Sequence, residues 1–161
     1  MKKKHIGIVF LLFFLFLSGL YGQTREDFAA VVDFNLDLET LSQLASGQAD
    51  FFSGNAPLVL VTGSVASRMV VRPGPEDYLA EIEIVDGRWQ GLEAVTTFRC
   101  IVRFEGPDYV TFVPARRSRR PPPEEIPLNA TVLVVGKPVE VRSGESGEEA
   151  VLAGYFVRIL D

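Results

Sequence analysis

Tyr78-Leu-Ala-Glu-Ile-Glu-Ile-Val85 and Val95-Thr-Thr-Phe-Arg-Cys-Ile-Val-Arg-Phe104 are the two stretches that decide the fold. Both alternate between apolar and polar residues, which is the period of a β-strand with one face in a core. The predicted core positions are Tyr78, Ala80, Ile82, Ile84, Phe98, Cys100, Val102 and Phe104. A Gly-containing connection over residues 86–91 joins the two strands and carries the only Trp of the chain, Trp89. The pattern therefore predicts two long neighbouring strands with a short connection.

Further strands are predicted on both sides of this pair. Residues 58–71 form a β-rich run in which Gly63 predicts a bulge or a sharp bend. Residues 131–141 predict a strand that is broken around Gly136 and Pro138, and residues 150–160 predict a last strand after a polar hairpin turn. Residues 109–113 are expected to form a short strand or an extended crossing. The chain is thus mainly β, with about five strands.

The segment between the third and fourth of these strands has an unusual composition. Residues 115–127 contain three consecutive prolines, which force an extended backbone, so this segment is predicted to be a solvated loop. It is rich in positive charge, partly offset by Glu124 and Glu125. Its candidate anion contacts are Arg116, Arg117, Arg119 and Arg120.

The N-terminus predicts an exported protein. Three Lys precede an apolar run of about 12 residues, too short to cross a bilayer as a helix, and small residues follow it. We therefore expect residues 1–22 to be a signal peptide, and the mature protein to be periplasmic or secreted. An uncleaved membrane anchor is the alternative. Cleavage would change the formal net charge from -5 to -8, because the leader carries three Lys and no acid.

Residues 23–57 differ from the β-rich remainder, and we expect an N-terminal helical and linker segment followed by a β-barrel domain over residues 58–161. Asp37 is a good N-cap, and Gly47 a plausible stop, for a short helix. The apolar residues between them recur at helical spacing: Leu38, Leu41, Leu44 and Ala45. The helix is expected to pack on the sheet; docking into a groove of a partner is the alternative, including a membrane-bound envelope partner.

Taken together, residues 58–161 resemble an OB-fold of the anticodon-binding-like (tRNA_anti-like) type. The resemblance rests on the first strand with its Gly63 bend, on the central pair containing Phe98-Arg-Cys-Ile-Val102, and on the run Pro127-Leu-Asn-Ala-Thr-Val-Leu-Val-Val-Gly136. Asn129 stands about where a turn Gly usually sits. The helix usual between the third and fourth strands has no counterpart, because the Arg/Pro segment occupies that position. The resemblance implies a small five-stranded Greek-key barrel with a short N-terminal helical segment.

An OB-fold also implies ligand binding across its second and third strands and the flanking loops. The candidate ligand-binding residues of that surface are Arg88, Trp89, Thr97, Arg99 and Arg103. Two other interpretations are open. The arginines could pair with Glu81 and Glu83 to stabilise a solvated sheet, and Trp89 could fold back over a barrel end instead of offering a stacking surface.

The sequence offers little catalytic chemistry. The only His lies in the leader, and the single Cys100 lies on an apolar strand face, which predicts an inert core thiol. The usual zinc ligand sets and the Ser-His or Cys-His arrangements are therefore excluded. No calcium-loop spacing is present. We expect no enzyme activity, no metal and no cofactor.

These features predict an exported, non-enzymatic binding module of the cell envelope with a protein, peptide or glycan partner. Nucleic acid is expected to be an unlikely partner, because a mature charge of -8 repels phosphates. The alternative is a binder of polyanions or single-stranded nucleic acid that uses the Arg segment 116–120. Oligomeric state and ligand identity do not follow from the sequence.

Overall fold

The computed structural model describes residues 25–52, 54–91, 94–116, 119–144 and 147–160. The predicted leader, residues 1–22, lies outside them. By its contacts the chain forms two compact units, residues 1–30 and 31–161. The helix α2 (Arg25–Val31) spans this boundary, and every element discussed below belongs to the second unit. No helix among the described residues is long and apolar enough to cross a membrane.

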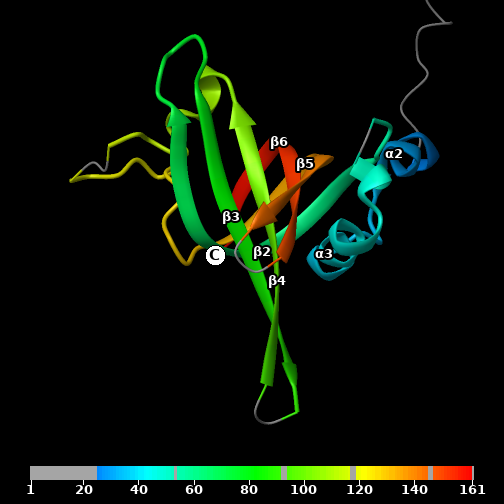
Figure 1. The fold of residues 1–161 in the computed structure, drawn as a ribbon. Helices are drawn as coiled ribbons and strands as arrows, with labels where there is room; N and C mark the ends of the chain where they lie inside the picture. Colours follow the sequence, from blue (N-terminus) through cyan, green and yellow to red (C-terminus); the bar gives the residue numbers. More distant parts are fainter. Residues whose placement is uncertain (1–24, 53, 92–93, 117–118, 145–146, 161) are drawn as a thin grey trace, which may run out of the picture. The chain divides into compact units, whose positions relative to one another are not determined.

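Five long strands form a closed barrel (Figure 1). Neighbours in the sheet follow the order β2-β3-β4-β6-β5, and β5 pairs with β2 to close it. All of these pairings are antiparallel except that of β4 with β6, which is parallel. A two-residue strand, β1 (Val32–Asp33), runs parallel to the start of β2. The fold is therefore the mainly β, five-stranded OB-like barrel that was predicted. The strands are β2 (Leu58–Arg72), β3 (Leu79–Gln90), β4 (Ala94–Glu105), β5 (Thr131–Gly144) and β6 (Gly147–Leu160).

Strand β2 changes partner halfway along its length. Residues 59–64 pair with β5, and residues 64–72 pair with β3. Gly63 lies at this change. A Cβ there would come within 2.7 Å of the Val85 carbonyl oxygen, so only glycine permits the close approach of the two strands. Of the two alternatives predicted for Gly63, a bulge or a sharp bend, the bulge is wrong, because the register shifts fall further on, at 65–67 and 70–72.

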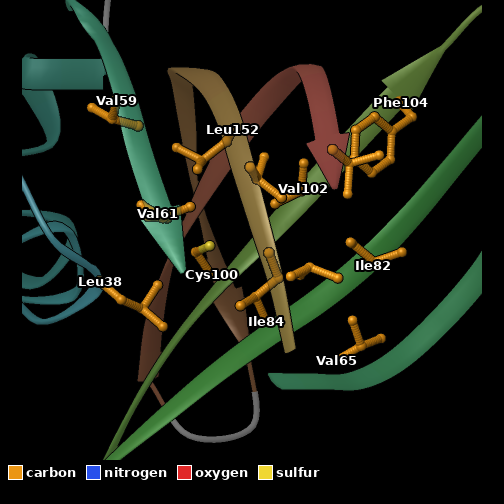
Figure 2. Close-up of a cluster of buried hydrophobic side chains, with 14 of the residues drawn as sticks. Leu38, Val59, Val61, Val65, Ile82, Ile84, Cys100, Val102, Phe104 and Leu152 are labelled. Carbon is orange, nitrogen blue, oxygen red and sulfur yellow. The ribbon is translucent and has the colours of Figure 1, made fainter. Parts of the chain in front are cut away.

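The barrel interior is apolar, and all the positions predicted for it except Phe98 are buried (Figure 2). Phe98 is partly buried against the cluster. Cys100 is fully buried as a free thiol, which confirms it as a core residue. Burial raises the pKa of the Cys100 thiol to about 12, so it carries no thiolate near neutral pH.

Helix α3 (Leu38–Gly47) packs on the barrel as expected. The Asp37 carboxylate accepts a hydrogen bond of 2.8 Å from the Thr40 N–H, which is the predicted N-cap. The pKa of Asp37 is lowered by that bond. The buried face of α3 belongs to the same apolar cluster as the strands, through Leu38, Leu41 and Ala45.

The β3–β4 hairpin is longer than predicted. The strand continues through residues 86–90, which had been assigned to the connection, and they pair in unbroken register with residues 94–98. Among the described residues, β2 reaches β3 no further than Val85, and β6 reaches β4 no further than Cys100. Residues 86–90 and 94–98 therefore form a two-stranded arm that runs beyond the barrel (Figure 1).

The connection from β4 to β5, residues 106–130, contains no helix longer than the three-residue 3-10 turn η2 (Pro107–Tyr109) in its described part. The short strand expected at residues 109–113 is wrong; these residues continue as turns after η2. Val113 and Ile126 from this connection are buried in the core. The segment thus occupies the place of the usual OB helix without forming one, because its prolines cannot sustain helical hydrogen bonds.

Candidate functional site

The outer surface of β3 and β4 is where the resemblance places the ligand. Register and alternation put four of the five candidates there: Trp89, Thr97, Arg99 and Arg103. Arg88 points to the other face of the arm, where its guanidinium forms an ion pair with Glu39 of α3. The structure therefore brings four predicted residues to one surface and separates the fifth from them.

The arginines of this surface are held in a network of ion pairs. Arg103 lies 3.4 Å from Glu81 and 2.7 Å from Glu140. Arg142 donates two hydrogen bonds to the Glu81 carboxylate, of 2.9 and 3.0 Å. A second group joins Arg99 to Glu83 at 3.2 Å and to Glu149 at 4.0 Å. The strand surface of β3 and β4 is in this way tied to β5 and β6. We call these seven residues the strand-face network.

The strand-face network leaves no positive charge for an anionic ligand. Three arginines face four glutamates, so its net charge is negative. The hydrogen bonds from Arg142 lower the pKa of Glu81, whose burial acts in the opposite direction. The pKa of Glu140 is lowered in the same way, first by its bond from Arg103. These glutamates stay ionised at neutral pH, and the cross-strand pairs stabilise the sheet.

Two hollows lie on either side of the Arg103 pairs. One, of about 310 Å³, is lined mainly by charged residues of the strand-face network together with Met69 and Ile101. The other, of about 350 Å³, lies between Arg103, Val139 and the rings of Tyr109 and Tyr155. Both are open and strongly polar at their Arg ends, which suits water better than an apolar ligand.

Trp89 is 70% exposed on the two-stranded arm. The expectation that it folds back over a barrel end is therefore wrong. Its cross-strand neighbour Val95 is also exposed, at 47%. The arm thus presents an aromatic surface to solvent, and such a surface can stack on the face of any base.

The arginine segment 116–120 differs from the strand face in its partners. Arg116, Arg119 and Arg120 are exposed, and Arg117 lies outside the described residues. Within the described part of the chain, no hydrogen bond or ion pair engages Arg116 or Arg119. The expected neutralisation by Glu125 is wrong, because Glu125 is buried and pairs with Arg68 of β2 at 2.7 Å. Arg116 and Arg119 therefore offer positive charge to a ligand, as does the exposed Arg158 of β6, which also has no partner among the described residues.

Sequence reasoning missed Glu140, Arg142 and Glu149, which complete the strand-face network from β5 and β6. Glu140 fell within the predicted strand 131–141, but Arg142 and Glu149 had been assigned to a polar hairpin turn, and the structure extends β5 and β6 to include them. Sequence reasoning missed Arg68 as well, whose partner is 57 residues away along the chain. Among the described residues, no group of three or more His, Cys, Asp or Glu side chains is arranged to hold a metal ion.

Comparison with known proteins gives likeness of fold only. No protein-family model and no curated protein matches the chain. Among solved structures, the small single-stranded DNA-binding protein of Streptomyces coelicolor is 13% identical, with a TM-score of 0.43 over 66% of this chain and 95% of that one. The Plasmodium falciparum SSB in complex with single-stranded DNA is 12% identical, with a TM-score of 0.43 over 68% and 98%. A mitochondrial single-stranded DNA-binding protein of S. cerevisiae is 12% identical, with a TM-score of 0.38 over 64% and 93%.

The prediction of an envelope binding module with a protein, peptide or glycan partner, and with nucleic acid as an unlikely one, is corrected. The solved structures named above are those of single-stranded DNA-binding proteins. Net charge had been the reason to call nucleic acid an unlikely partner, but it does not describe how the charges are distributed. Arg116 and Arg119 are exposed and unpaired within the described residues, whereas each glutamate of the strand-face network lies beside an arginine.

Proposed function

We propose that this chain binds single-stranded nucleic acid without sequence specificity, with phosphate contacts from the arginine segment 116–120. The observation that carries the proposal is that Arg116 and Arg119 are exposed and unengaged within the described residues, whereas Arg99, Arg103 and Arg142 are paired with glutamates. Phosphate neutralisation by Arg and Lys supplies most of non-specific affinity. At a Debye length of about 10 Å in 0.1 M salt, such a local cluster acts on a strand even in a chain of negative net charge.

Trp89 supplies the second component of the proposed site. A sequence-tolerant binder combines basic side chains with aromatic rings on which bases stack, and Trp89 is exposed on the arm that extends the predicted OB surface. Thr97 shares that surface. Arg88, Arg99 and Arg103 have structural ion pairs, so we assign them no direct role in holding phosphates.

The test is fluorescence anisotropy of a labelled oligo(dT) in a salt series, with the double variant Arg116→Ala/Arg119→Ala. Each lost phosphate contact lowers the slope of log K against log salt by about 0.7, so the double variant is expected to lose up to about 1.4 in slope. The matched control is Arg72→Ala/Arg158→Ala, which removes two exposed arginines elsewhere and should keep the slope. Quenching of the single Trp reports in the same titration whether bases reach Trp89.

Absence of salt-dependent binding at low ionic strength would end the proposal. Equal binding of oligo(dT) and of heparin, without Trp quenching, would reduce it to a general affinity for polyanions. Loss of binding in the control double variant would place the contacts elsewhere on the barrel.

We also propose that the protein is exported through a cleaved leader, residues 1–22, which precedes an N-terminal segment 23–57 and the barrel domain 58–161. The support is the sequence of three Lys, an apolar run and small residues. Intact mass of the protein recovered from the periplasm or medium of an expressing bacterium should correspond to a start near Gln23. A full-length mass in the cytosol would contradict export. We retain the anticodon-binding-like (tRNA_anti-like) type as a proposal, to be withdrawn if a crystal structure shows other strand connections.

A further inference from the structure

A hollow of about 500 Å³ lies at the base of the arginine segment. One wall is the outer half of β2, and the other is formed by the two ends of the β4–β5 connection. Most of its lining residues are apolar, but backbone groups, one hydroxyl and one guanidinium make the surface that they expose to the hollow more polar than apolar: Ala66, Ser67, Arg68, Val70, Pro73, Val113, Pro114, Ala115 and Leu128. Its volume falls within the range of about 300–1,000 Å³ typical of small-ligand sites.

The edge of β2 that borders this hollow is not covered by a strand. Strand β5 pairs with β2 only as far as Ser64. The last backbone hydrogen bonds on this side run from the Asn129 N–H to the Val65 carbonyl, at 2.8 Å, and from the Val65 N–H to the Ala130 carbonyl, at 3.0 Å. Among the described residues, no further segment pairs with residues 66–72 from that side. Backbone hydrogen-bonding groups of an edge strand remain open to a ligand there.

The two ends of the loop that carries the arginine segment 116–120 are fixed side by side against the barrel. The Ile126 N–H donates to the Phe112 carbonyl at 2.9 Å, and the Tyr78 hydroxyl donates to the Val113 carbonyl. Arg68 reaches the other end, donating to the Ile126 carbonyl at 2.6 Å and pairing with Glu125 at 2.7 Å. Ala115, which lines the hollow, directly precedes Arg116. Arg116 is therefore joined directly to the lining of the hollow.

We propose that this hollow takes a nucleobase of the strand whose phosphates are held by the arginine segment. This rests on the proposed function and adds to it the place where a base is bound. A base combines an apolar face with a hydrogen-bonding edge, which matches the apolar side chains of the lining beside the Ser67 hydroxyl and the open edge of β2. The nucleobase carries its own phosphate. Three arginines lie in the lining or directly next to a lining residue along the chain: Arg68, Arg72 and Arg116.

The experiment compares labelled oligo(dT) with an oligonucleotide of the same length made of abasic sites, which keeps every phosphate and lacks the bases. Each is titrated into the wild type, into Ala66→Leu and into Ala115→Leu, which fill the hollow from opposite walls. The matched control is Ala30→Leu, the same substitution at an exposed alanine outside the barrel unit. Thermal unfolding of all variants verifies that they fold.

The wild type should bind oligo(dT) about 5-fold to 100-fold more tightly than the abasic strand, because base contacts in single-strand sites are of that size. Ala66→Leu and Ala115→Leu should reduce this preference to the part that stacking on Trp89 supplies and leave the abasic affinity unchanged, and Ala30→Leu should retain it in full. Equal wild-type affinity for the two strands would overturn the base site while leaving phosphate binding in place. A preference that both filling substitutions leave at its wild-type size would also overturn it. If neither strand binds at low salt, the base site and the proposed function both fall.

Discussion

At Gly63 the backbone of β2 passes so close to β3 that no side chain fits. The nearest atoms to a Cβ would be Cγ2 of Ile84 at 2.5 Å and the carbonyl oxygen of Val85 at 2.7 Å. The second of these is backbone and cannot move aside without breaking the β2–β3 pairing. A glycine within a β-rich run predicted a bulge or a sharp bend at this residue, whereas the close contact with β3 follows only from the structure.

Gly63→Ala is therefore expected to lower the free energy of unfolding by about 2–3 kcal/mol, in the range of overpacked cores. Urea denaturation measures the change. Gly47→Ala is the control: a Cβ at this helical position meets nothing within 4 Å, so stability should stay the same or rise by up to about 1 kcal/mol. A Gly63→Ala variant as stable as the wild type would show that β2 and β3 are further apart than described.

Asn129 is the second residue whose backbone decides its identity. Its φ of 67° lies in the left-handed region, which favours Gly and admits Asn more readily than most other residues. The sequence pattern of the OB-fold has a turn Gly at about this place. Asn129 thus forms the turn at that place, and its N–H donates a hydrogen bond to the Val65 carbonyl oxygen.

At the scale of the elements, ion pairs occupy the outer face of β3 and β4, where the OB resemblance places a ligand. Glu81 is 8% exposed and is held by Arg103 of β4 and Arg142 of β5. Its pKa is lowered, first by the bonds from Arg142, so it binds a proton less readily in the folded than in the unfolded chain. The stabilisation from this carboxylate is complete above about pH 5. It is lost as the pH falls through the ordinary glutamate value of about 4.3 and then through the lower folded value.

Glu81→Gln should therefore lower the free energy of unfolding at pH 7 by about 1–2 kcal/mol. This is less than for a fully buried pair, because the Arg142 side chain is 38% exposed. The difference from the wild type should shrink between about pH 5 and pH 3. Chemical denaturation at a series of pH values measures it. Glu76→Gln, an exposed carboxyl in the turn before β3, should change neither quantity, and a Glu81→Gln loss that did not depend on pH would contradict the assignment.

In the whole molecule, the net charge of -5 is a sum over two surfaces whose arginines differ in their pairing. The strand face has its arginines and glutamates in mutual contact, whereas Arg116 and Arg119 on the β4–β5 connection are exposed. Binding of a polyanion is governed by the local cluster within about a Debye length and not by the sum over the chain. For this reason the net charge by itself does not exclude a polyanionic partner.

Alternation made the barrel predictable, because inward positions such as Ile82 and Val102 recur with the period of two that a strand imposes. Local chemistry was equally sufficient for α3, where Asp37 caps the first turn. The length of the β3–β4 arm was missed, since Asp86, Gly87 and Gln90 have low strand propensity. Their pairing with residues 94–98 is seen only in the folded structure.

By itself the sequence determined which residues enter the core, that about five strands surround them, and where a helix cap and a proline-rich loop must lie. These properties depend on the periodicity and on the conformational preferences of single residues. Only the tertiary structure decided which arginines are occupied: Arg142 reaches Glu81 across 61 residues of chain, and Arg68 reaches Glu125 across 57. Ion pairing depends on distances in space, and those distances exist only once the barrel has closed.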